Sequence, residues 1–397
     1  MKLPTKRMSN IPFTGGIREI LSKADKMEKE GKKIIHLEIG RPDFGSPEVA
    51  IQALIKSIKA GQMHYSDISG VEELRAAIAD NIKRTIGIEV NPYNEIVVGV
   101  GAVEGLINSM ISLLDVGDEI IFLTPCFPAY FDEAFLAGVI PVEVPLKFSD
   151  NYSLDINELK RKVTNKTKMI LINSPNNPTG AILSREDLEK IAQIAIENDL
   201  FVVSDDAYSE FYFDQKWTSI ATIPGMRERT IIVNTTSKAF SMTGWRVGYT
   251  IARPEITRYL CKTHQNMTTQ PSTFAQYGAV AAYESGKSWT EMMVKEFKRR
   301  RDLVIRYLDQ IHGIDYIKPE GAFYFFLCID KLNMSSDEFC DYIIREAGVA
   351  LVPGDAFKGE KGRHFVRLAY ANSYENIEEG MKRIKKAIEK LKQLLCS

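Results

Sequence analysis

The sequence predicts an α/β protein in which a large domain is built on a mostly parallel, doubly wound sheet and a smaller α+β domain accompanies it. The chain has 397 residues, enough for two domains and a substantial core. From residue 48 to 233, short apolar runs of strand type alternate with longer stretches of helical periodicity. Such alternation is typical of parallel strands whose sheet is covered by helices on both faces.

The expected elements follow from these patterns in chain order. A helix at 17–30 and a strand at 33–39 lead into the Pro- and Gly-rich turn Gly40–Pro47. The next part should contain helices at 48–60, 70–84, 103–114 and 185–197 and strands at 95–100, 119–123, 168–172, 201–204 and 230–233. The last part should contain helices at 288–311, 336–346 and 375–395 and strands at 321–329, near 349 and near 365. We therefore expect a large domain at 46–287 and a small domain that joins 1–45 to 288–397.

Composition excludes several classes of partner. The formal net charge of -1 and the pI near 6.6 leave no electrostatic footprint for nucleic acid or an anionic membrane. The five cysteines form no Cys-x-x-Cys pair, so neither a metal site nor a disulfide framework is indicated. No run approaches the roughly 18 apolar residues that a membrane helix needs, and the first residues lack a signal core. These features predict a cytoplasmic protein.

The chemistry should centre on residues 234–248, Asn-Thr-Thr-Ser-Lys-Ala-Phe-Ser-Met-Thr-Gly-Trp-Arg-Val-Gly. Lys238 should lie just past the carboxyl end of a strand, where open α/β sheets bind ligands. A lysine near the permanent cation Arg246 in a semi-apolar pocket can lose its proton near neutral pH, which makes its amine a nucleophile for a carbonyl. Thr235, Ser237 and Arg246 together predict a phosphate holder. A nucleophilic lysine beside a phosphate holder indicates pyridoxal phosphate.

A glycine turn at the start of a helix offers a second phosphate contact. Residues 98–105, Val-Gly-Val-Gly-Ala-Val-Glu-Gly, follow a predicted strand, and their backbone amides can bind an anion. The dinucleotide fingerprint Gly-x-Gly-x-x-Gly is not complete, because Glu104 stands at the third glycine. A dinucleotide oxidoreductase also leaves Lys238 unexplained.

Two further loops follow strands and carry polar side chains. In Ser174-Pro-Asn-Asn-Pro-Thr-Gly180, the amide of Asn177 can donate a hydrogen bond into the pocket. Asp205 comes directly after the run 201–204, and Tyr208 follows one turn later. Burial raises the pKa of a carboxyl group unless a cation pairs with it. A protonated pyridine nitrogen would be such a cation, and the pair would make the cofactor an electron sink.

In order and spacing, these motifs resemble the pyridoxal-phosphate aminotransferases of the aspartate aminotransferase fold, the class I/II family. The resemblance runs from Gly40-Arg-Pro-Asp-Phe44 to Val366-Arg-Leu-Ala-Tyr-Ala371. It implies the type I pyridoxal-phosphate enzyme fold and a ping-pong reaction that moves the amino group of an α-amino acid to a 2-oxo acid. The reaction would proceed through an internal aldimine, in which the cofactor is bound to the amine of Lys238.

The resemblance also implies roles for single residues. Lys238, Asp205 and Tyr208 would be catalytic, and Gly40, Asn177 and Arg367 would bind the substrate. The cofactor would be held by Gly101, Ala102, Val103, Phe127, Asn177, Asp205, Tyr208, Thr235, Ser237, Lys238, Arg246 and Tyr65. Tyr65 would reach the phosphate of a neighbouring subunit, so the resemblance implies a homodimer with shared active sites.

Two alternatives and the substrate remain open at the level of sequence. A lyase on the same fold, for carbon-sulfur β-elimination or of the ring-forming 1-aminocyclopropane-1-carboxylate (ACC) synthase type, needs the same electron sink. A non-catalytic pyridoxal-phosphate-binding regulator is less favoured, because no basic DNA-binding segment is present. A dicarboxylate substrate needs a second cation, and the stretch 265–275 contains no Arg or Lys. The candidates for that cation are Arg18, Arg41, Lys262 and His264; otherwise the pocket suits an aromatic or aliphatic side chain.

Overall fold

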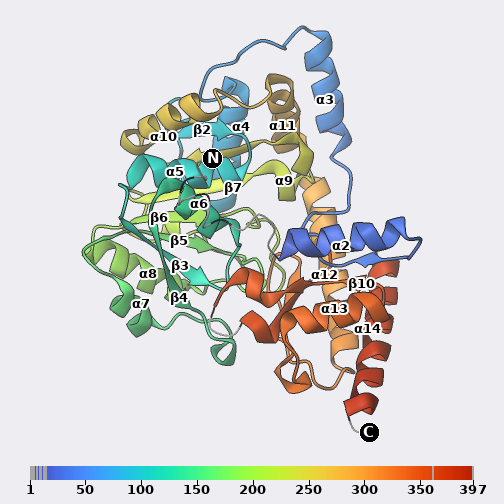
Figure 1. Cartoon of the computed structure of the whole chain (residues 1–397). Coiled ribbons are helices and arrows are strands. Elements are labelled where there is room, and N and C mark those ends of the chain that lie inside the picture. The colour runs from blue at the N-terminus through green and yellow to red at the C-terminus, as the bar shows by residue number, and fades with distance from the viewer. Residues whose placement is uncertain (1–4, 6–7, 9–10, 12–15, 360–361, 396–397) are drawn as a thin grey trace.

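A computed structural model of the chain describes residues 5, 8, 11, 16–359 and 362–395 (Figure 1). Its centre is a seven-stranded sheet with the strand order β2-β8-β7-β6-β5-β3-β4. The strands are β2 (Ile96–Gly99), β3 (Glu119–Thr124), β4 (Ile140–Pro145), β5 (Thr167–Asn173), β6 (Phe201–Asp205), β7 (Thr230–Thr235) and β8 (Gly248–Ile251). β8 is antiparallel to both of its neighbours, and every other neighbouring pair is parallel. The prediction of a mostly parallel sheet is confirmed.

Helices cover both faces of this sheet because its strands are apolar on both sides. On β7, Ile231 and Val233 pack in a buried cluster with the helices at 102–113 and 254–267, whereas Ile232 packs in a second cluster with the helices at 72–86 and 273–285. The helices of this part are α3 (Glu48–Lys59), α4 (Glu72–Ile86), α5 (Ala102–Leu113), α6 (Ala129–Ala137), α7 (Ile156–Lys162), α8 (Arg185–Glu197), α9 (Thr236–Ala239), α10 (Pro254–Met267) and α11 (Thr273–Ser285). This is the doubly wound arrangement predicted from the sequence.

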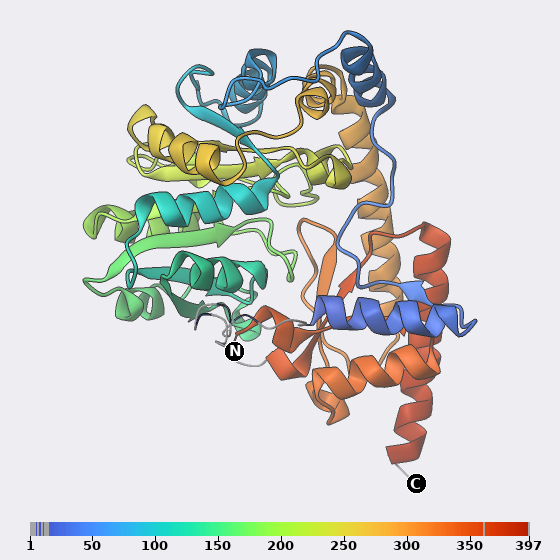
Figure 2. The ribbon, with the colours of Figure 1, turned by 45° about the horizontal axis from the view of Figure 1, so that its top comes forward.

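A second group of elements lies to one side of the sheet and is joined to it by the long helix α12 (Figure 2). It contains the helices α2 (Ile17–Lys29), α12 (Lys287–Leu308), α13 (Ser336–Glu346) and α14 (Tyr374–Leu395). Its strands are β1 (Ile35–His36), β9 (Tyr324–Cys328), β10 (Val349–Ala350), β11 (Val352–Pro353) and β12 (Phe365–Ala369). β11, β12 and β9 form an antiparallel sheet, and β1 pairs in parallel with β10. The early strand therefore joins the late elements, while the domain boundaries at 46 and 287 stay a prediction.

Short 3₁₀ helices complete the chain at Phe148–Asp150, Ile220–Thr222, Thr243–Trp245, Asp330–Leu332, Gly354–Phe357 and Gly362–His364. Local sequence sets many of the helix ends. At α13, for example, the Ser335 side chain accepts the backbone N–H of Glu338, and the Glu338 carboxylate accepts that of Ser335 in return. This capping box explains why the start of α13 was predictable to the residue.

The structure adds three strands to those expected, β4, β8 and the two-residue β11, and shortens another. β4 was missed because Pro141 and Pro145 argue against a strand, but β4 is the edge of the sheet, where a missing N–H is tolerated. β8 begins at Gly248, inside the stretch that the sequence analysis assigned to chemistry. The strand expected at 33–39 is regular only at Ile35–His36.

Candidate active site

Lys238 lies where the sequence predicted, immediately after the carboxyl end of a central strand. β7 ends at Thr235, and the single-turn helix α9 carries the lysine. Thr235 caps this turn, because its hydroxyl accepts the N–H of Ser237. The Lys238 Nζ donates a hydrogen bond of 2.7 Å to the backbone carbonyl of Gly40. The amine is thus held between the sheet and the segment that follows β1.

A cavity of about 310 Å³ opens beside this amine and gathers most of the predicted site. The predicted residues that line it are Gly40, Ala102, Val103, Phe127, Asn177, Asp205, Tyr208, Thr235, Ser237, Lys238, Arg246 and Arg367. Sequence reasoning missed other lining residues, which are Leu106, Tyr130, Asn173, Ala207, Thr243 and Tyr324. The predicted lining residues come from segments up to more than 300 residues apart, from position 40 to position 367, and the fold brings them together.

The environment of Lys238 favours the neutral amine. Its pKa is lowered to about 8, chiefly by burial and then by the positive charges of Arg367 and Arg246, while Asp205 opposes them. Desolvation and Arg367 therefore contribute more than Arg246, the cation named from the sequence. An amine with this pKa is partly unprotonated at neutral pH and can attack a carbonyl carbon.

Asp205 is a buried carboxylate at the end of β6, and it makes no ion pair within the described parts of the chain. Tyr130 donates a hydrogen bond of 2.6 Å to its Oδ2, and the N–H of Ala207 donates to its Oδ1 at 3.1 Å. Burial raises the pKa of Asp205, and both hydrogen bonds oppose that rise. A buried carboxylate without a cation, facing a cavity, fits the protonated nitrogen of a pyridine ring.

Arg367 is fully buried on β12 and faces the same cavity. Its Nη1 donates to Oδ1 of Asn177 at 2.9 Å, and its Nη2 donates to the carbonyl of Glu38 at 2.6 Å. Because the amide oxygen of Asn177 accepts from Arg367, its NH₂ group remains a donor. The guanidinium lies over the ring of Tyr324, with 4.7 Å between Cζ and the ring centroid.

The hydroxyls of Tyr208 and Tyr324 lie 2.8 Å apart, so Tyr208 already has a partner. Sequence reasoning missed Tyr324 because it stands within Phe323-Tyr-Phe-Phe326, which is typical of a core strand. Phe127 lies at the cavity wall with its ring edge-on to Tyr130, 5.7 Å between centroids.

The corner formed by Gly101 and Arg246 suits a phosphate. A Cβ on Gly101 would lie 2.4 Å from Nη2 of Arg246, and Gly101 has a φ of +83°, so only glycine fits. No side chain caps the start of α5, which leaves the amides of its first turn free for an anion. The carboxylate of Glu104 accepts the N–H of Val100 and holds the turn. That contact explains the acidic residue at the position of a third glycine.

Some predicted residues lie away from the cavity. Tyr65 is 85 % exposed and does not line it. His264 was a wrong candidate for a substrate-binding cation: it is fully buried, and its Nδ1 lies 2.6 Å from Glu104. Arg41 and Lys262 are exposed, and the side chain of Arg18 lies outside the described residues.

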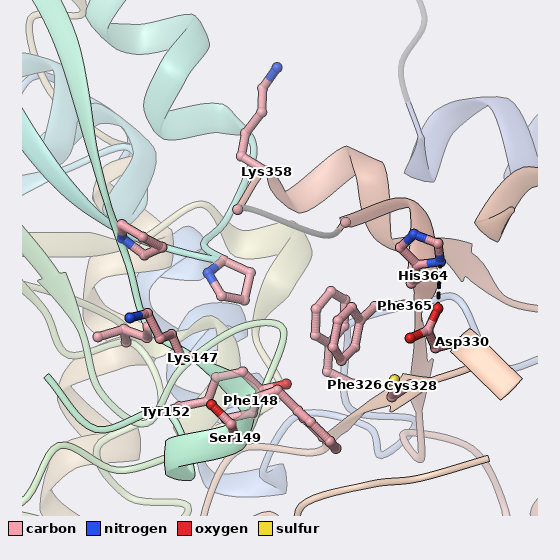
Figure 3. A pocket seen from close by; sticks show the side chains of 15 residues that line it. Lys147, Phe148, Ser149, Tyr152, Phe326, Cys328, Asp330, Lys358, His364 and Phe365 are labelled. Carbon is pink, nitrogen blue, oxygen red and sulfur yellow. Dashed lines mark ion pairs between the residues drawn. The ribbon is translucent and has the colours of Figure 1, made fainter. Parts of the chain in front are cut away.

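A second cavity, of about 350 Å³, lies between the end of β4 and the β9–β12 sheet (Figure 3). None of the predicted site residues line it. It contains the ion pair of His364 and Asp330, with 3.2 Å between Nδ1 and Oδ1, and the side chain of Lys358 points away from it. The chemistry described above therefore belongs to the smaller cavity.

Among the described residues, no three His, Cys, Asp or Glu side chains lie close enough to hold a metal ion. Among the same residues, no helix has the length and apolar character needed to cross a membrane.

Known proteins are similar to this chain in sequence and fold. The family of class I and II aminotransferases matches residues 32–384. The chain is 43% identical to an aspartate aminotransferase of Pyrococcus abyssi, over 91% of this chain and 93% of that protein. It is 41% identical to aromatic-amino-acid aminotransferase 2 of Thermococcus litoralis, over 90% and 92% of the two chains.

Solved structures agree with these relatives. The aspartate aminotransferase of Thermus thermophilus with maleate superposes with a TM-score of 0.92 at 32% identity, covering 98% of this chain and all of that one. An aromatic aminotransferase of Pyrococcus horikoshii gives 0.87 at 41% identity, over 94% and 99%. Nothing in the comparisons favours the lyase alternative. The chain therefore belongs to the class I and II aminotransferases and is a pyridoxal-phosphate-dependent aminotransferase.

Proposed function

We propose that this aminotransferase prefers aromatic amino acids as amino donors and passes the amino group to a 2-oxo acid in a ping-pong reaction. The supporting observation is the number of cations in the cavity. Its described lining contains three, Lys238, Arg246 and Arg367. If Lys238 is the nucleophile and Arg246 binds phosphate, only Arg367 is left for a carboxylate. The α-carboxylate that every substrate carries would occupy it, and the described lining of this subunit offers no further cation for a side-chain carboxylate.

Bound pyridoxal phosphate supplies an electron sink that stabilises the charge left when the substrate α-carbon loses its proton. The residues present fit this group. Asp205 would pair with the ring nitrogen, and Phe127 would stack on the ring. The phosphate would be held by Gly101, Ala102, Val103, Thr235, Ser237 and Arg246, and the phenolic oxygen would be contacted by Asn177 and Tyr208.

The amine of Lys238 would move the proton at the α-carbon. Its pKa of about 8 leaves enough neutral amine at neutral pH to accept that proton and enough ammonium to return it. The carbonyl of Gly40 orients the amine from one side. Arg367, held by Asn177 and the carbonyl of Glu38, would orient both substrates through the α-carboxylate.

Initial rates with phenylalanine, tyrosine and aspartate as donors, at fixed 2-oxoglutarate, test the substrate class. We expect kcat/KM for phenylalanine to exceed that for aspartate by about tenfold or more, because an aspartate side chain finds no described cation. The reverse order would support aspartate, the substrate named for the Pyrococcus abyssi relative. Lys238→Ala should reduce turnover by about a thousandfold or more, and substantial residual turnover would contradict the mechanism.

We also propose a cytoplasmic homodimer with shared active sites. Tyr65 supports the dimer, because an 85 % exposed aromatic residue that the resemblance places against a phosphate needs a second subunit to reach one. Exposed apolar side chains on the same chain, including Ile58, Met63 and Met267, would be covered by that subunit. The free cysteines at 126, 261, 328 and 340 fit a reducing compartment.

A further inference from the structure

The backbone carbonyls of Glu38 and Gly40 accept hydrogen bonds from two of the cations that line the cavity, Arg367 and Lys238. The Glu38 carbonyl accepts from Nη2 of Arg367 at 2.6 Å, and the Gly40 carbonyl accepts from Nζ of Lys238 at 2.7 Å. Leu37 fixes the start of this segment on both sides. Its N–H donates to the carbonyl that ends β10, and its carbonyl accepts the N–H that ends β12, at 3.2 and 2.7 Å.

The side chain of Glu38 is a buried carboxylate held by a histidine. It has no exposed surface, its Oε1 lies 2.6 Å from Nδ1 of His36, and its Oε2 has no hydrogen-bond partner. The other ring nitrogen of His36 lies 3.3 Å from the exposed carboxylate of Glu28. The hydrogen bond to Glu38 raises the pKa of His36 to about 9, so the ring is charged at neutral pH. A buried carboxylate that is only partly satisfied is costly unless nearby cations stabilise it.

Arg367 is the second cation near Glu38. It is 1 % exposed, forms no ion pair with a carboxylate among the described residues, and its Nε has no partner. Burial lowers its pKa, whereas Tyr324, Tyr208 and Glu38 raise it. Glu38 is therefore the carboxylate whose charge acts on Arg367, although the two side chains form no ion pair.

We propose that Glu38, held by His36, is a positioning residue for Arg367: it fixes the carbonyl to which the guanidinium donates and supplies a buried charge that His36 balances. The role of Glu38 rests on the proposed function of Arg367 as the carboxylate-binding residue. While His36 is charged, the Glu38–His36 pair is neutral and Arg367 keeps its attraction for the substrate. When His36 loses its proton, the pair becomes negative and competes with the substrate carboxylate.

Substitution of Glu38 tests the positioning role in the cofactor-loaded enzyme. The ligand is 3-phenylpropanoate or maleate, whichever binds better, since both are carboxylates without an amino group; calorimetry gives Kd. We expect Glu38→Ala to raise Kd and KM by about tenfold and to change kcat less than about threefold. Glu28→Ala removes the other carboxylate on His36, is exposed, and serves as the matched control with Kd nearly unchanged. Equal effects of the two substitutions, or a fall in kcat at constant KM, would overturn the proposal.

The pH dependence separates this role from a purely structural one. The titratable groups that face His36 are Glu38 and Glu28. Because the pKa of Lys238 also lies in the alkaline range, the measurement compares wild type with Glu38→Gln, in which Lys238 is unchanged. In wild type, Kd should rise more steeply above pH 9 than in Glu38→Gln, since the amide cannot become an unbalanced charge. Parallel profiles overturn the proposal. If Glu38→Ala does not fold, the nearly isosteric Glu38→Gln alone decides.

An Arg367→Gln variant separates failure of this inference from failure of the proposed function. If it binds the ligand as well as wild type, Arg367 does not bind the carboxylate and both proposals fall. If Arg367→Gln loses binding while both Glu38 variants bind the ligand with the Kd of wild type, only the proposed role of Glu38 is wrong.

Discussion

The hydroxyl of Tyr130 donates a hydrogen bond of 2.6 Å to a carboxylate oxygen of Asp205, and both side chains are buried. Burial raises the pKa of Asp205, and this bond is the largest of the effects that lower it. Tyr130 therefore favours the ionised carboxylate, the form that can hold a protonated pyridine nitrogen. The tyrosine lies on α6, which packs against the sheet next to β3.

Tyr130→Phe should weaken cofactor binding. Loss of the hydroxyl raises the pKa of Asp205 and leaves a smaller fraction ionised at neutral pH. A hydrogen bond to a charged group contributes about 1.5–3 kcal/mol, so we expect Kd for pyridoxal phosphate to rise by at least about tenfold. Titration of the cofactor-free protein with pyridoxal phosphate measures this Kd. Tyr152→Phe is the matched control, because Tyr152 is equally buried and its hydroxyl has no partner. Equal effects of the two substitutions would contradict the role of Tyr130.

The pH dependence of cofactor capture should report the pKa of Lys238. Capture needs the neutral amine, so its rate in the cofactor-free protein should increase with pH and level off above about 8, well below the 10.5 of an ordinary lysine. Arg367→Gln removes a positive charge that lowers this pKa, so the inflection should move to higher pH. The exposed Arg363→Gln is the control. An unmoved inflection in Arg367→Gln would show that Arg367 does not contribute to the low pKa of Lys238.

Sequence patterns could predict the sites at strand ends because the strands themselves have a strong signal. The β-branched run before Lys238 and the apolar run before Asp205 mark β7 and β6, and in a parallel sheet both ends meet at one edge. The family motifs then added Arg367, which spacing alone could not bring to that edge.

Contacts between distant segments could not be predicted in this way. Tyr130 lies 75 residues from Asp205, and Tyr324 lies 116 residues from Tyr208. Tyr130 and Tyr324 both stand in apolar runs. The local sequence therefore does not distinguish a tyrosine that contacts the active site from one that only packs in the core. Glu38 is similar: it follows a strand of two residues, and its burial depends on β10 and β12, more than 300 residues later.

Gly101→Ala should disrupt the phosphate corner. The new Cβ would lie 2.4 Å from Arg246, so the guanidinium must move, and we expect Kd for pyridoxal phosphate to rise by about a hundredfold. With a φ of +83° and a ψ of 171°, residue 101 also has a backbone conformation essentially restricted to glycine, so the substitution adds strain of roughly 1–3 kcal/mol. Gly117→Ala is the control, because Gly117 has a φ of +95° and open space around its Cβ position. Both variants should lower the free energy of unfolding, and only Gly101→Ala should lose affinity for pyridoxal phosphate. If the two variants bind pyridoxal phosphate with equal affinity, Arg246 does not contribute to the phosphate site.

Tyr65→Phe tests whether the active site is shared between subunits. If the hydroxyl of Tyr65 donates to the phosphate in the neighbouring subunit, its loss should raise Kd for pyridoxal phosphate by about tenfold without changing the mass of the particle. Sedimentation gives that mass, which should be twice that of the 44.8 kDa chain. Tyr93→Phe is the control, since Tyr93 is also exposed and its hydroxyl donates to Glu72 within the same chain. A monomeric mass would overturn the dimer. A dimer in which both substitutions leave Kd unchanged would keep the assembly but place Tyr65 outside the site.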